Sequence, residues 1–488
     1  ITVATLLLVK NVIPCPQSPL SSKATPVSMN FLCNFNTLTI KGIETNKSTQ
    51  LLPDSSIVLN DNSSTSKNFN RTQRVSINYE IGLDSFSTIK FYSRFNAKDY
   101  ANQQEIFSTA INGKTLAYLN QSNQQEYSDG RNTGLNNSIV WQRRFRKKGR
   151  TVSINIQQSS DNQNGLLQTE ANNLLYDTTI STVSQEIVAQ QQYNKSLVNA
   201  YASKINYTEK FTKMLSLQVS YAYKLTNTKK ERMVFEKNSA GKYELLIDSL
   251  SSTYSCNISS HLPSFIVQIN SKKYDLSAGG DIVFTTLKQS GFNLNLSDRS
   301  FINFSPKVNL QAKFSQLTSL NIRYNGHTRQ PSVEQLQPLK DKSNSLMEVI
   351  GNPNLKPSFY HNFSINFFKY SLTSFSNIQS SISYSFTQNA IASNQTYEQF
   401  NKTKIQYVNI SGNDNFYASV GFERNFKKAN LTLGININYY GSNYASFINS
   451  IKNNNQNSNQ NTAWSISPTC AVRPCRQRPN QHKNQNDN

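Results

Sequence analysis

The sequence predicts an all-β fold, an antiparallel up-and-down β-barrel that crosses a membrane with its strands. Apolar and polar residues alternate in many segments, as they do in strands whose two faces meet different surroundings. Short and long polar connections follow one another between these segments. A low apolar content combines with many aromatic residues, and this composition suits a barrel that has a wet interior and long loops.

The alternation is clearest in 215–225 and 431–439. In 215–225, Leu, Val and Tyr occupy one face, whereas Ser, Gln, Ala and Lys occupy the other. About fourteen candidate strands result, many of them near the ten or so residues that a tilted strand needs to cross a bilayer. The other clear segments are 75–81, 89–95, 152–156, 308–314, 320–324 and 378–386, and the weaker ones are 138–146, 201–209, 263–270, 274–285, 362–370 and 415–426.

The connections between candidate strands are short and long in turn. The short turns are 82–88, 147–150, 210–214, 315–319 and 427–430, and the long polar segments are 96–137, 159–200, 226–262, 327–361 and 387–414. Outer-membrane barrels have tight periplasmic turns and extended outer loops, so this rhythm favours a barrel over a soluble sandwich. Because every backbone amide must be bonded in lipid, such strands persist only in a closed sheet. Aromatic residues at strand ends are expected in the interfacial girdle, among them Tyr223, Phe386, Tyr439 and Tyr440.

The composition excludes some classes of protein. Hydrophobic residues make up 36% of the 488 residues, yet 27 Phe and 24 Tyr argue against plain disorder. No apolar run of about 18 residues occurs, which excludes a spanning helix. The formal charge of +22 prompts a nucleic-acid hypothesis, but no recognisable nucleic-acid module is present. The densest basic runs, 143–148 and 427–428, lie at or beside predicted turns, so basic turns and loops that face anionic lipid or a negatively charged ligand are the preferred interpretation.

The cysteines and the chain ends define little. Five cysteines are spread thinly without a CxxC pair, so neither a zinc ribbon nor a dense disulfide framework is supported; they are Cys15, Cys33, Cys256, Cys470 and Cys475. We expect three parts: a poorly defined N-terminal segment at 1–66, the barrel at 67–467, and a disordered basic low-complexity tail at 468–488.

Two segments carry a resemblance to a known family. Residues 328–338 read Thr-Arg-Gln-Pro-Ser-Val-Glu-Gln-Leu-Gln-Pro, and residues 351–357 read Gly-Asn-Pro-Asn-Leu-Lys-Pro. The pair resembles the barrel of TonB-dependent receptors, and most closely the branch called outer membrane β-barrel family proteins. In that branch the two elements bracket an outer loop and the next strand follows at once, here at 361–370. The motif residues are Arg329, Pro331, Ser332, Gly351, Asn352, Pro353, Asn354, Leu355 and Pro357.

The same motif has a physical interpretation of its own. Pro353 and Pro357 fix φ and lack an N–H donor, so the segment cannot continue a sheet. Gly351 and Asn352 tolerate turn conformations. The segment is therefore expected to shape the loop and to lead rigidly into the next strand, rather than to bind a ligand.

The resemblance, which covers roughly 70–468, implies a receptor or transport barrel in the outer membrane of a Gram-negative cell. Such a receptor binds a nutrient, and a plug moved from the inner membrane admits it. The implied partners are outer-membrane lipid, an unidentified small nutrient ligand and an energy-coupling protein that acts through a plug domain. Receptors of this class carry about twenty-two strands, and we find about fourteen, no plug and no coupling box. The chain is therefore expected to be a truncated barrel portion.

No constellation of residues supports catalysis. The histidines form no HExxH pair, although His327 and His361 flank the motif loop and could approach each other; exposed loop histidines are the preferred interpretation. Residues 113–115 resemble the end of a P-loop, but Ser108 stands where the first glycine should be. No GxSxG is present, and the acids are sparse. We therefore predict no enzyme, no catalytic or metal residue, no cofactor and no nucleic-acid partner. The alternative function is a secreted or surface-exposed structural or adhesin β-protein.

Overall fold

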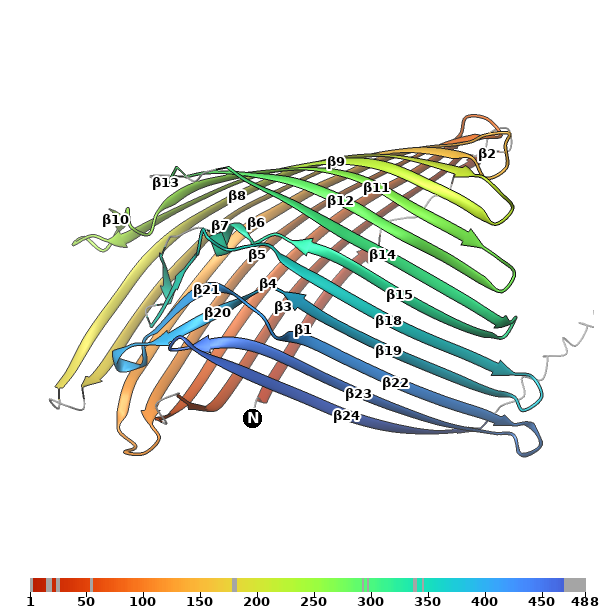
Figure 1. The fold of residues 1–488 in the computed structure, drawn as a ribbon. Coiled ribbons are helices and arrows are strands. Elements are labelled where there is room, and N and C mark those ends of the chain that lie inside the picture. The colour runs from red at the N-terminus through yellow and green to blue at the C-terminus, as the bar shows by residue number, and fades with distance from the viewer. Residues whose placement is uncertain are drawn as a thin grey trace, which may run out of the picture.

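A computed structural model describes residues 3–14, 20–22, 27–52, 56–177, 182–291, 294–295, 298–336, 340–344 and 346–468. They form one largely antiparallel sheet that curves around a wide hollow (Figure 1). Seventeen strands follow one another as a meander, each bonded to the one before it, which confirms the predicted all-β up-and-down fold. They are β1(Val3–Pro14), β3(Val27–Leu51), β4(Ile57–Gly82), β5(Ser87–Asn112), β6(Tyr118–Arg144), β7(Thr151–Asp177), β8(Thr182–Lys210), β9(Leu215–Lys237), β11(Ser252–Asn270), β12(Tyr274–Gly291), β14(Arg299–Ser315), β15(Thr318–Arg329), β18(Ser358–Ser371), β19(Ser376–Gln388), β22(Asn413–Phe426), β23(Leu431–Ile448) and β24(Ile451–Pro468).

The strand count exceeds the predicted fourteen because no alternation predicts β1, β3 and β24. Within the described parts of the chain, β1 and β24 do not pair with each other, so the sheet is not closed. The predicted boundary between the N-terminal segment and the barrel, at residue 67, lies within β4, and the division into three parts stays a prediction. Residues 469–488 of the predicted tail lie outside the described residues. No helix among the described residues is long and apolar enough to cross a membrane.

The strands of the first half are much longer than a bilayer requires. β3 to β9 contain 23 to 29 residues each, whereas β15, β18, β19 and β22 contain 12 to 14. At about 3.3 Å per residue, β8 is roughly 95 Å long. We call β3–β9 the tall wall. The predicted long loops 96–137 and 159–200 are therefore wrong for most of their length, since they belong to the paired strands β5–β8.

The physical reason is the loss of alternation outside the bilayer. Where water meets both faces of a sheet, both faces are polar, so the period of two that marks a membrane strand disappears. The backbone ladder nevertheless continues, as between Gln103 and Tyr127 on β5 and β6. The polar tract 453–461 likewise lies in β24.

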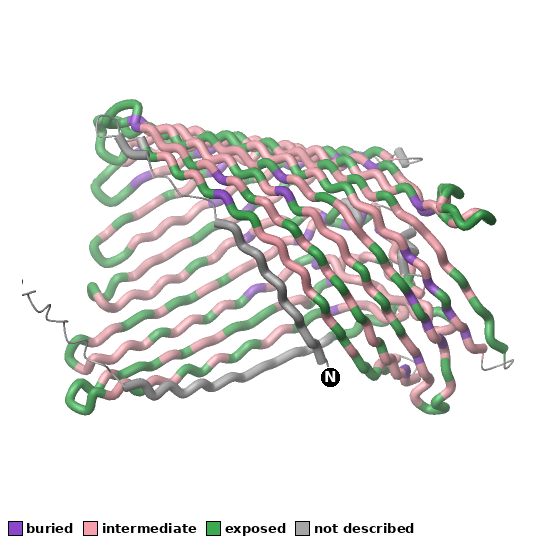
Figure 2. Tube along the Cα trace, turned by 180° about the vertical axis from the view of Figure 1, so that it is seen from behind, coloured by how far each residue is buried: buried purple, intermediate pink, exposed green. Residues whose placement is uncertain are grey.

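The membrane-facing part is a band of apolar residues near the short-turn end. In the middle of β18, Ile365 is 41% exposed and is paired with Ile322 on β15 and Ile382 on β19. Corresponding residues on other strands continue the band: Phe91, Ile139, Ile154, Ile205, Val219, Phe265, Ile282, Phe304, Val308, Val420 and Ile437. Outward apolar residues on every strand are what a band about 25 Å tall requires. Figure 2 shows the outer surface of the tall wall from behind.

Five short turns were predicted, and all five lie between consecutive meander strands. They connect β4 to β5, β6 to β7, β8 to β9, β14 to β15 and β22 to β23, and they gather at one end of the sheet (Figure 1). In the first of them, the backbone N–H of Leu83 donates to the Ser87 carbonyl. In the last, η2(Lys427–Ala429) ends at Asn430 with a φ of 47°, a left-handed conformation that asparagine tolerates.

Short elements fill the connections at the other end. They are β10(Tyr243–Leu246) after β9, β13(Leu294–Asn295) before β14, α1(Val333–Leu336), β16(Lys340–Asn344) and β17(Met347–Ile350) before β18, and β20(Ala390–Tyr397), η1(Gln399–Asn401) and β21(Thr403–Ile410) before β22. The small strand β2(Leu20–Ser22) pairs with β3. The predicted long loop 226–262 consists mostly of the ends of β9 and β11 with β10 between them, whereas 327–361 and 387–414 each contain several short elements.

An ion pair fastens β10 to the tall wall beyond the apolar band. Glu170 on β7 accepts hydrogen bonds from the Lys237 ammonium at 2.6 Å and from the Tyr243 hydroxyl at 2.8 Å. The Lys237 ammonium, followed by the Tyr243 hydroxyl, lowers the pKa of Glu170 below its ordinary value. The stabilisation is therefore fully present above the ordinary carboxyl pKa and is lost as the pH falls through the lowered one.

We expect amide hydrogen exchange in 238–251 to accelerate several-fold at low pH, after correction for intrinsic exchange. Glu170→Gln should give the faster exchange already at neutral pH and should remove most of the pH dependence. Glu236→Gln removes the same charge next to Lys237 and serves as the control. Equal exchange in the wild type and Glu170→Gln across the pH range would contradict this role of Glu170.

Candidate ligand-entry site at the mouth of the barrel

The motif loop, residues 330–357, begins with a capped turn of helix. The Ser332 hydroxyl accepts the backbone N–H of Gln335 at 3.2 Å, and the Gln335 side chain accepts the backbone N–H of Ser332 at 2.9 Å. This reciprocal pair is a capping box, which satisfies two donors that the helix leaves free. It explains why Ser at 332 and Gln at 335 begin α1 directly after the buried Pro331.

Two leucines anchor the loop to the inner side of the sheet. Leu336 and Leu355 are each 1% exposed and share a small core with Tyr254 and Cys256 of β11 and with Leu287 of β12. Tyr254 and Cys256 come from the predicted long loop 226–262, and Leu287 lies just beyond the predicted weak strand 274–285. No local pattern identifies them, because their contact with the leucines depends on the curvature of the sheet.

Charged and amide side chains hold the backbone of the second motif element. Arg299 donates to the carbonyl of Pro353 at 2.7 Å and to the carbonyl of Leu355 at 2.8 Å. The Asn352 amide donates to the Tyr407 carbonyl at 2.9 Å, and its Oδ1 accepts the backbone N–H of Asn354. These bonds satisfy carbonyls that two prolines keep out of any ladder. Arg299 was not singled out from the sequence, and an arginine within a polar strand gives no signal of this role.

The structure brings most of the nine motif residues into one unit. Gly351, Asn352, Pro353, Asn354 and Leu355 form a turn beside α1, since the Asn352 N–H donates to the Gln335 carbonyl at 2.6 Å. Arg329 instead lies at the end of β15, with its guanidinium 4.9 Å from the ring centre of Tyr360. Pro357 ends the loop directly before β18, as expected. The structural role of the motif stays a prediction.

A second connection, residues 389–412, crosses the hollow, and we call it the strap. Its strands β20 and β21 pair with each other, and β21 also pairs in parallel with β17 from the motif loop. Asn409 on β21 accepts the backbone N–H of Lys356 at 2.8 Å and donates to the Lys356 carbonyl at 2.9 Å. The motif loop and the strap thus form one folded layer at the mouth (Figure 1).

The tip of the strap is bonded to the opposite, tall wall. Asn120 on β6 donates to the Phe400 carbonyl at 2.6 Å, and Lys402 pairs with Glu186 on β8 at 2.6 Å. Gln399 donates to Asp177 at the end of β7 at 3.3 Å. These residues are more than 200 positions apart in sequence, so the strap links the two halves of the sheet across the hollow.

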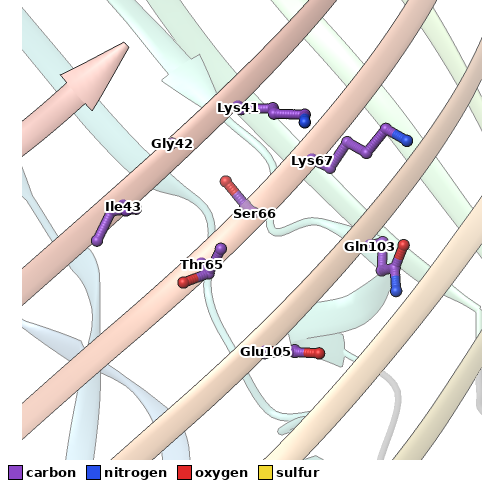
Figure 3. A pocket seen from close by; sticks show the side chains of 8 residues that line it. All are labelled: Lys41, Gly42, Ile43, Thr65, Ser66, Lys67, Gln103 and Glu105. Carbon is purple, nitrogen blue, oxygen red and sulfur yellow. The ribbon is translucent and has the colours of Figure 1, made fainter. Parts of the chain in front are cut away.

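A cavity of about 310 Å³ lies under this layer. It is lined by Leu346 from the motif loop and by alternate residues of the tall wall, namely Glu44, Asn46, Asn62, Ser64, Gln104, Ile106, Ser108, Ser122 and Gln124, with Ser63 at its edge. Apart from Ser63, these lining residues are even-numbered, so the even-numbered residues of β3–β6 lie on the concave, inner face of the sheet. A larger hollow of about 580 Å³ includes Lys41, Lys67 and Glu105, which are odd-numbered, so it lies on the opposite, outer surface of the tall wall (Figure 3).

The two histidines beside the motif lie in strands and on opposite faces of the sheet. His361 stacks on Phe386 on the outer face, with ring centres 4.3 Å apart, and its Nδ1 is 3.0 Å from the Tyr324 hydroxyl. His327 lies across from Tyr360, whose ring centre is 5.2 Å from its own, on the inner face. The expectation of loop histidines is wrong for both. Among the described residues, no group of three or more His, Cys, Asp or Glu is arranged to hold a metal ion.

Several aromatic residues occupy the outer face near the band edge. Tyr223 lies 5.0 Å from the His261 ring, and Phe386 belongs to the stack around His361. Tyr439 contacts Phe416 at 5.9 Å. Tyr440, the next residue, faces the inside because a strand turns successive side chains to opposite faces.

An all-β meander with an outward apolar band, a polar inner face and folded connections at one end defines the class of an outer-membrane barrel. The family model described as outer membrane protein beta-barrel family matches residues 143–472, more than half of the chain. The chain belongs to this family. The resemblance found at 328–357 is confirmed at the level of the family, the protein is located in the outer membrane, and the secreted alternative is not retained.

Solved structures of outer-membrane receptors are similar to the chain at low identity. One is the pyoverdine-bound FpvA of P. aeruginosa, at 11% identity and a TM-score of 0.42, with 90% of this chain and 64% of that chain covered. Another is the siderophore receptor PirA of Pseudomonas aeruginosa, at 10% identity and 0.42, with 95% and 73% covered. A third is the siderophore receptor PiuA of Acinetobacter baumannii, at 8% and 0.46, with 88% and 65% covered. The chain thus spans just under two thirds of FpvA. No curated protein sequence matches it.

Proposed function

We propose that the chain forms the barrel of an outer-membrane receptor that binds a small nutrient ligand at its mouth and admits it to the periplasm. The observation that carries this proposal is the strap, which crosses the mouth and is bonded through Asn120 and Glu186 to the far wall. A barrel for free diffusion has no need of a folded layer over its entrance. A layer of this kind selects what enters and offers polar groups to a ligand.

We further propose that passage in the full-length protein depends on TonB and on a plug domain. This part rests on the resemblance at 328–338 and 351–357 and on the family of the chain. It involves no catalytic step. The strap would hold the ligand at the mouth while the plug moves below it.

Shortening the strap tests its part in this function. Replacing 399–402 by two glycines removes the contacts with Asn120, Asp177 and Glu186. In a porin-poor strain we expect several-fold greater sensitivity to large hydrophilic antibiotics, because the mouth is no longer spanned. The control exchanges Lys427–Ala429, a turn at the opposite end, for two glycines. Unchanged sensitivity in a strap variant that reaches the outer membrane would contradict the proposal.

The nutrient and its energy requirement are tested together. A strain that lacks the gene is grown in a defined nutrient mixture, and the compounds that it fails to deplete are identified by mass spectrometry. We expect at least one such compound, and a protonophore should stop its depletion in the wild type as well. Depletion that continues with the protonophore would overturn the energy-coupled part alone.

A further inference from the structure

Basic residues recur along the inner face of the tall wall. On β5, Lys90, Arg94 and Lys98 are four residues apart. Because a strand turns every second side chain to the same face, all three face inward, about 13 Å from one to the next. Arg94 also lies 5.4 Å from the ring centre of Tyr92, two residues earlier on the same face.

A second basic edge lies four strands away, on β9. Successive pairings across the strands connect Tyr92 on β5 to Lys224 on β9; the residues between them are Ser138, Gln157 and Ala202. The same register carries Tyr100 through Gly130, Gly165 and Asn194 to Arg232. Between the two basic edges, at about 4.8 Å per strand, the floor is about 19 Å wide and, apart from Asp161 on β7, consists of small or neutral side chains. We call the inner face of β5–β9 between these rows the basic trough.

The trough contains two hollows built in the same way. The first has a volume of about 360 Å³, with Tyr92 on one side and Lys224 on the other. The second has a volume of about 300 Å³, with Tyr100 on one side and Lys230 and Arg232 on the other; Lys195 and Glu231 contribute to its edge. In the second hollow the Tyr100 hydroxyl lies directly over Gly130 and Gly165. A Cβ at either glycine would come within 2.7 Å or less of that hydroxyl, so the absence of side chains at these two positions makes room for the Tyr100 ring.

The charge balance differs between the faces of the same strands. Across the described residues from the Tyr92 row to the Tyr100 row, the inner face has five basic residues and one acidic residue: Arg94, Lys98, Lys224, Lys230 and Arg232 against Asp161. Over the same rows, the outer face has three basic and two acidic residues: Arg131, Lys195 and Lys229 against Asp99 and Glu231. The excess of positive charge thus belongs to the inside.

The inner wall across the hollow is different again. There Lys307 pairs with Asp281 at 2.6 Å, and Lys313 pairs with Asp275. Most of the remaining surface consists of amides and hydroxyls, as around Asn321, Asn366 and Ser381. The basic trough therefore faces a nearly neutral wall, and in a confined lumen its field attracts anions.

We propose that the basic trough binds a small polyanion, a ligand that carries two or more carboxylate or phosphate groups. The proposal rests on the proposed receptor function, whose ligand class it names. The two hollows lie about eight residues, or roughly 26 Å, apart along the strands, with Lys98 and Arg94 between them. An anion that leaves the outer hollow therefore meets another cation before it reaches the inner one. The motif loop borders the trough, since its leucines pack on Tyr254, the neighbour of Lys230 on β11.

Binding of a fluorescent polyanion tests the proposal. Pyrene tetrasulfonate is titrated into the full chain in detergent micelles and followed by fluorescence anisotropy. The trough variant combines Lys224→Gln, Lys230→Gln and Arg232→Gln, and the outer-face variant combines Arg131→Gln, Arg143→Gln and Lys229→Gln, none of which lines either hollow. Each variant lowers the net charge by three within β5–β9. We expect the Kd to rise by roughly tenfold or more for the trough variant and by no more than about twofold for the outer-face variant.

Equal weakening by both variants, or no binding by the wild-type chain, would overturn the proposal. Competition with citrate and with pyrophosphate shows whether carboxylates or phosphates are preferred, whereas displacement by neither overturns it. If the trough variant lacks the heat-modifiable gel mobility of a folded barrel, Lys224→Gln is compared with Lys229→Gln, and about a threefold rise in Kd is expected for the former only. Binding in micelles needs neither plug nor energy, so a failure of uptake with intact binding contradicts the receptor function alone.

Discussion

Replacing Ile365 by lysine is expected to destabilise the barrel by about 2–4 kcal/mol, the cost of a lysine at the lipid-facing midplane. Ile365 lies in the middle of β18 on the outer face, flanked by Ile322 and Ile382 on the neighbouring strands. It is 41% exposed in the sheet, and the surface that it exposes is covered by acyl chains. A lysine there must carry its ammonium to the interface or lose its proton.

The adjacent residue provides the matched control. Ser364 faces the inside, where the opposite side chains Arg323 and Ser383 are polar. Ser364→Lys is therefore expected to change the free energy of unfolding by less than about 1 kcal/mol. Urea titration of both variants in lipid vesicles, followed by heat-modifiable gel mobility, measures the difference. If both lysines cost the same, β18 does not have the orientation described here.

This contrast was largely predictable, because the bilayer imposes two surroundings on one strand. Alternation in 362–370 and 378–386 gives both the strand and the face, and neither depends on distant residues. The short turns were found for the same reason, since each is bounded by two such strands. The order of strands then follows from the chain itself in an up-and-down meander.

The tall wall could not be predicted in this way. Residues 96–137 have polar groups on both faces, and the same composition suits a loop. What makes them strands is the pairing of β5 with β6 along its whole length, including Gly130 beneath Tyr100. That pairing continues a hydrogen-bond ladder that begins in the membrane. The partner that makes a residue of β5 part of a strand therefore lies on β6, as Gly134 does for Asn96. A period of two within one segment does not carry this information.

The candidate site was predictable in part. The motif at 351–357 was identified from its sequence, and its prolines do interrupt the ladder before β18. The strap was assigned only to a long loop, since Asn120 and Glu186 are more than 200 residues from the groups that they bind. Arg299 and the Tyr254–Cys256 floor likewise contact the motif only because the sheet curves.

Leu355→Ala is expected to open the motif loop, and the free thiol of Cys256 reports it. Both side chains are 1% exposed and belong to one small core with Leu336, and a buried Leu→Ala change costs about 2–5 kcal/mol. Burial also raises the pKa of the Cys256 thiol, so little thiolate is available while the core is closed. The rate of maleimide labelling at Cys256, measured by peptide mass spectrometry, is expected to rise at least about tenfold in the variant.

The control for this experiment is Leu372→Ala, at a turn of the opposite end, where the leucine is 63% exposed. It removes the same atoms without a cavity and should leave the labelling of Cys256 unchanged. Arg299→Gln separates packing from backbone support, because it removes the bonds to the Pro353 and Leu355 carbonyls and leaves the leucine in place. We expect labelling between the wild-type and Leu355→Ala rates, since two unpaired carbonyls favour the open loop. Wild-type labelling in both Leu355→Ala and Arg299→Gln would mean that the motif does not shape this loop, and the structural role assigned to it would then be wrong.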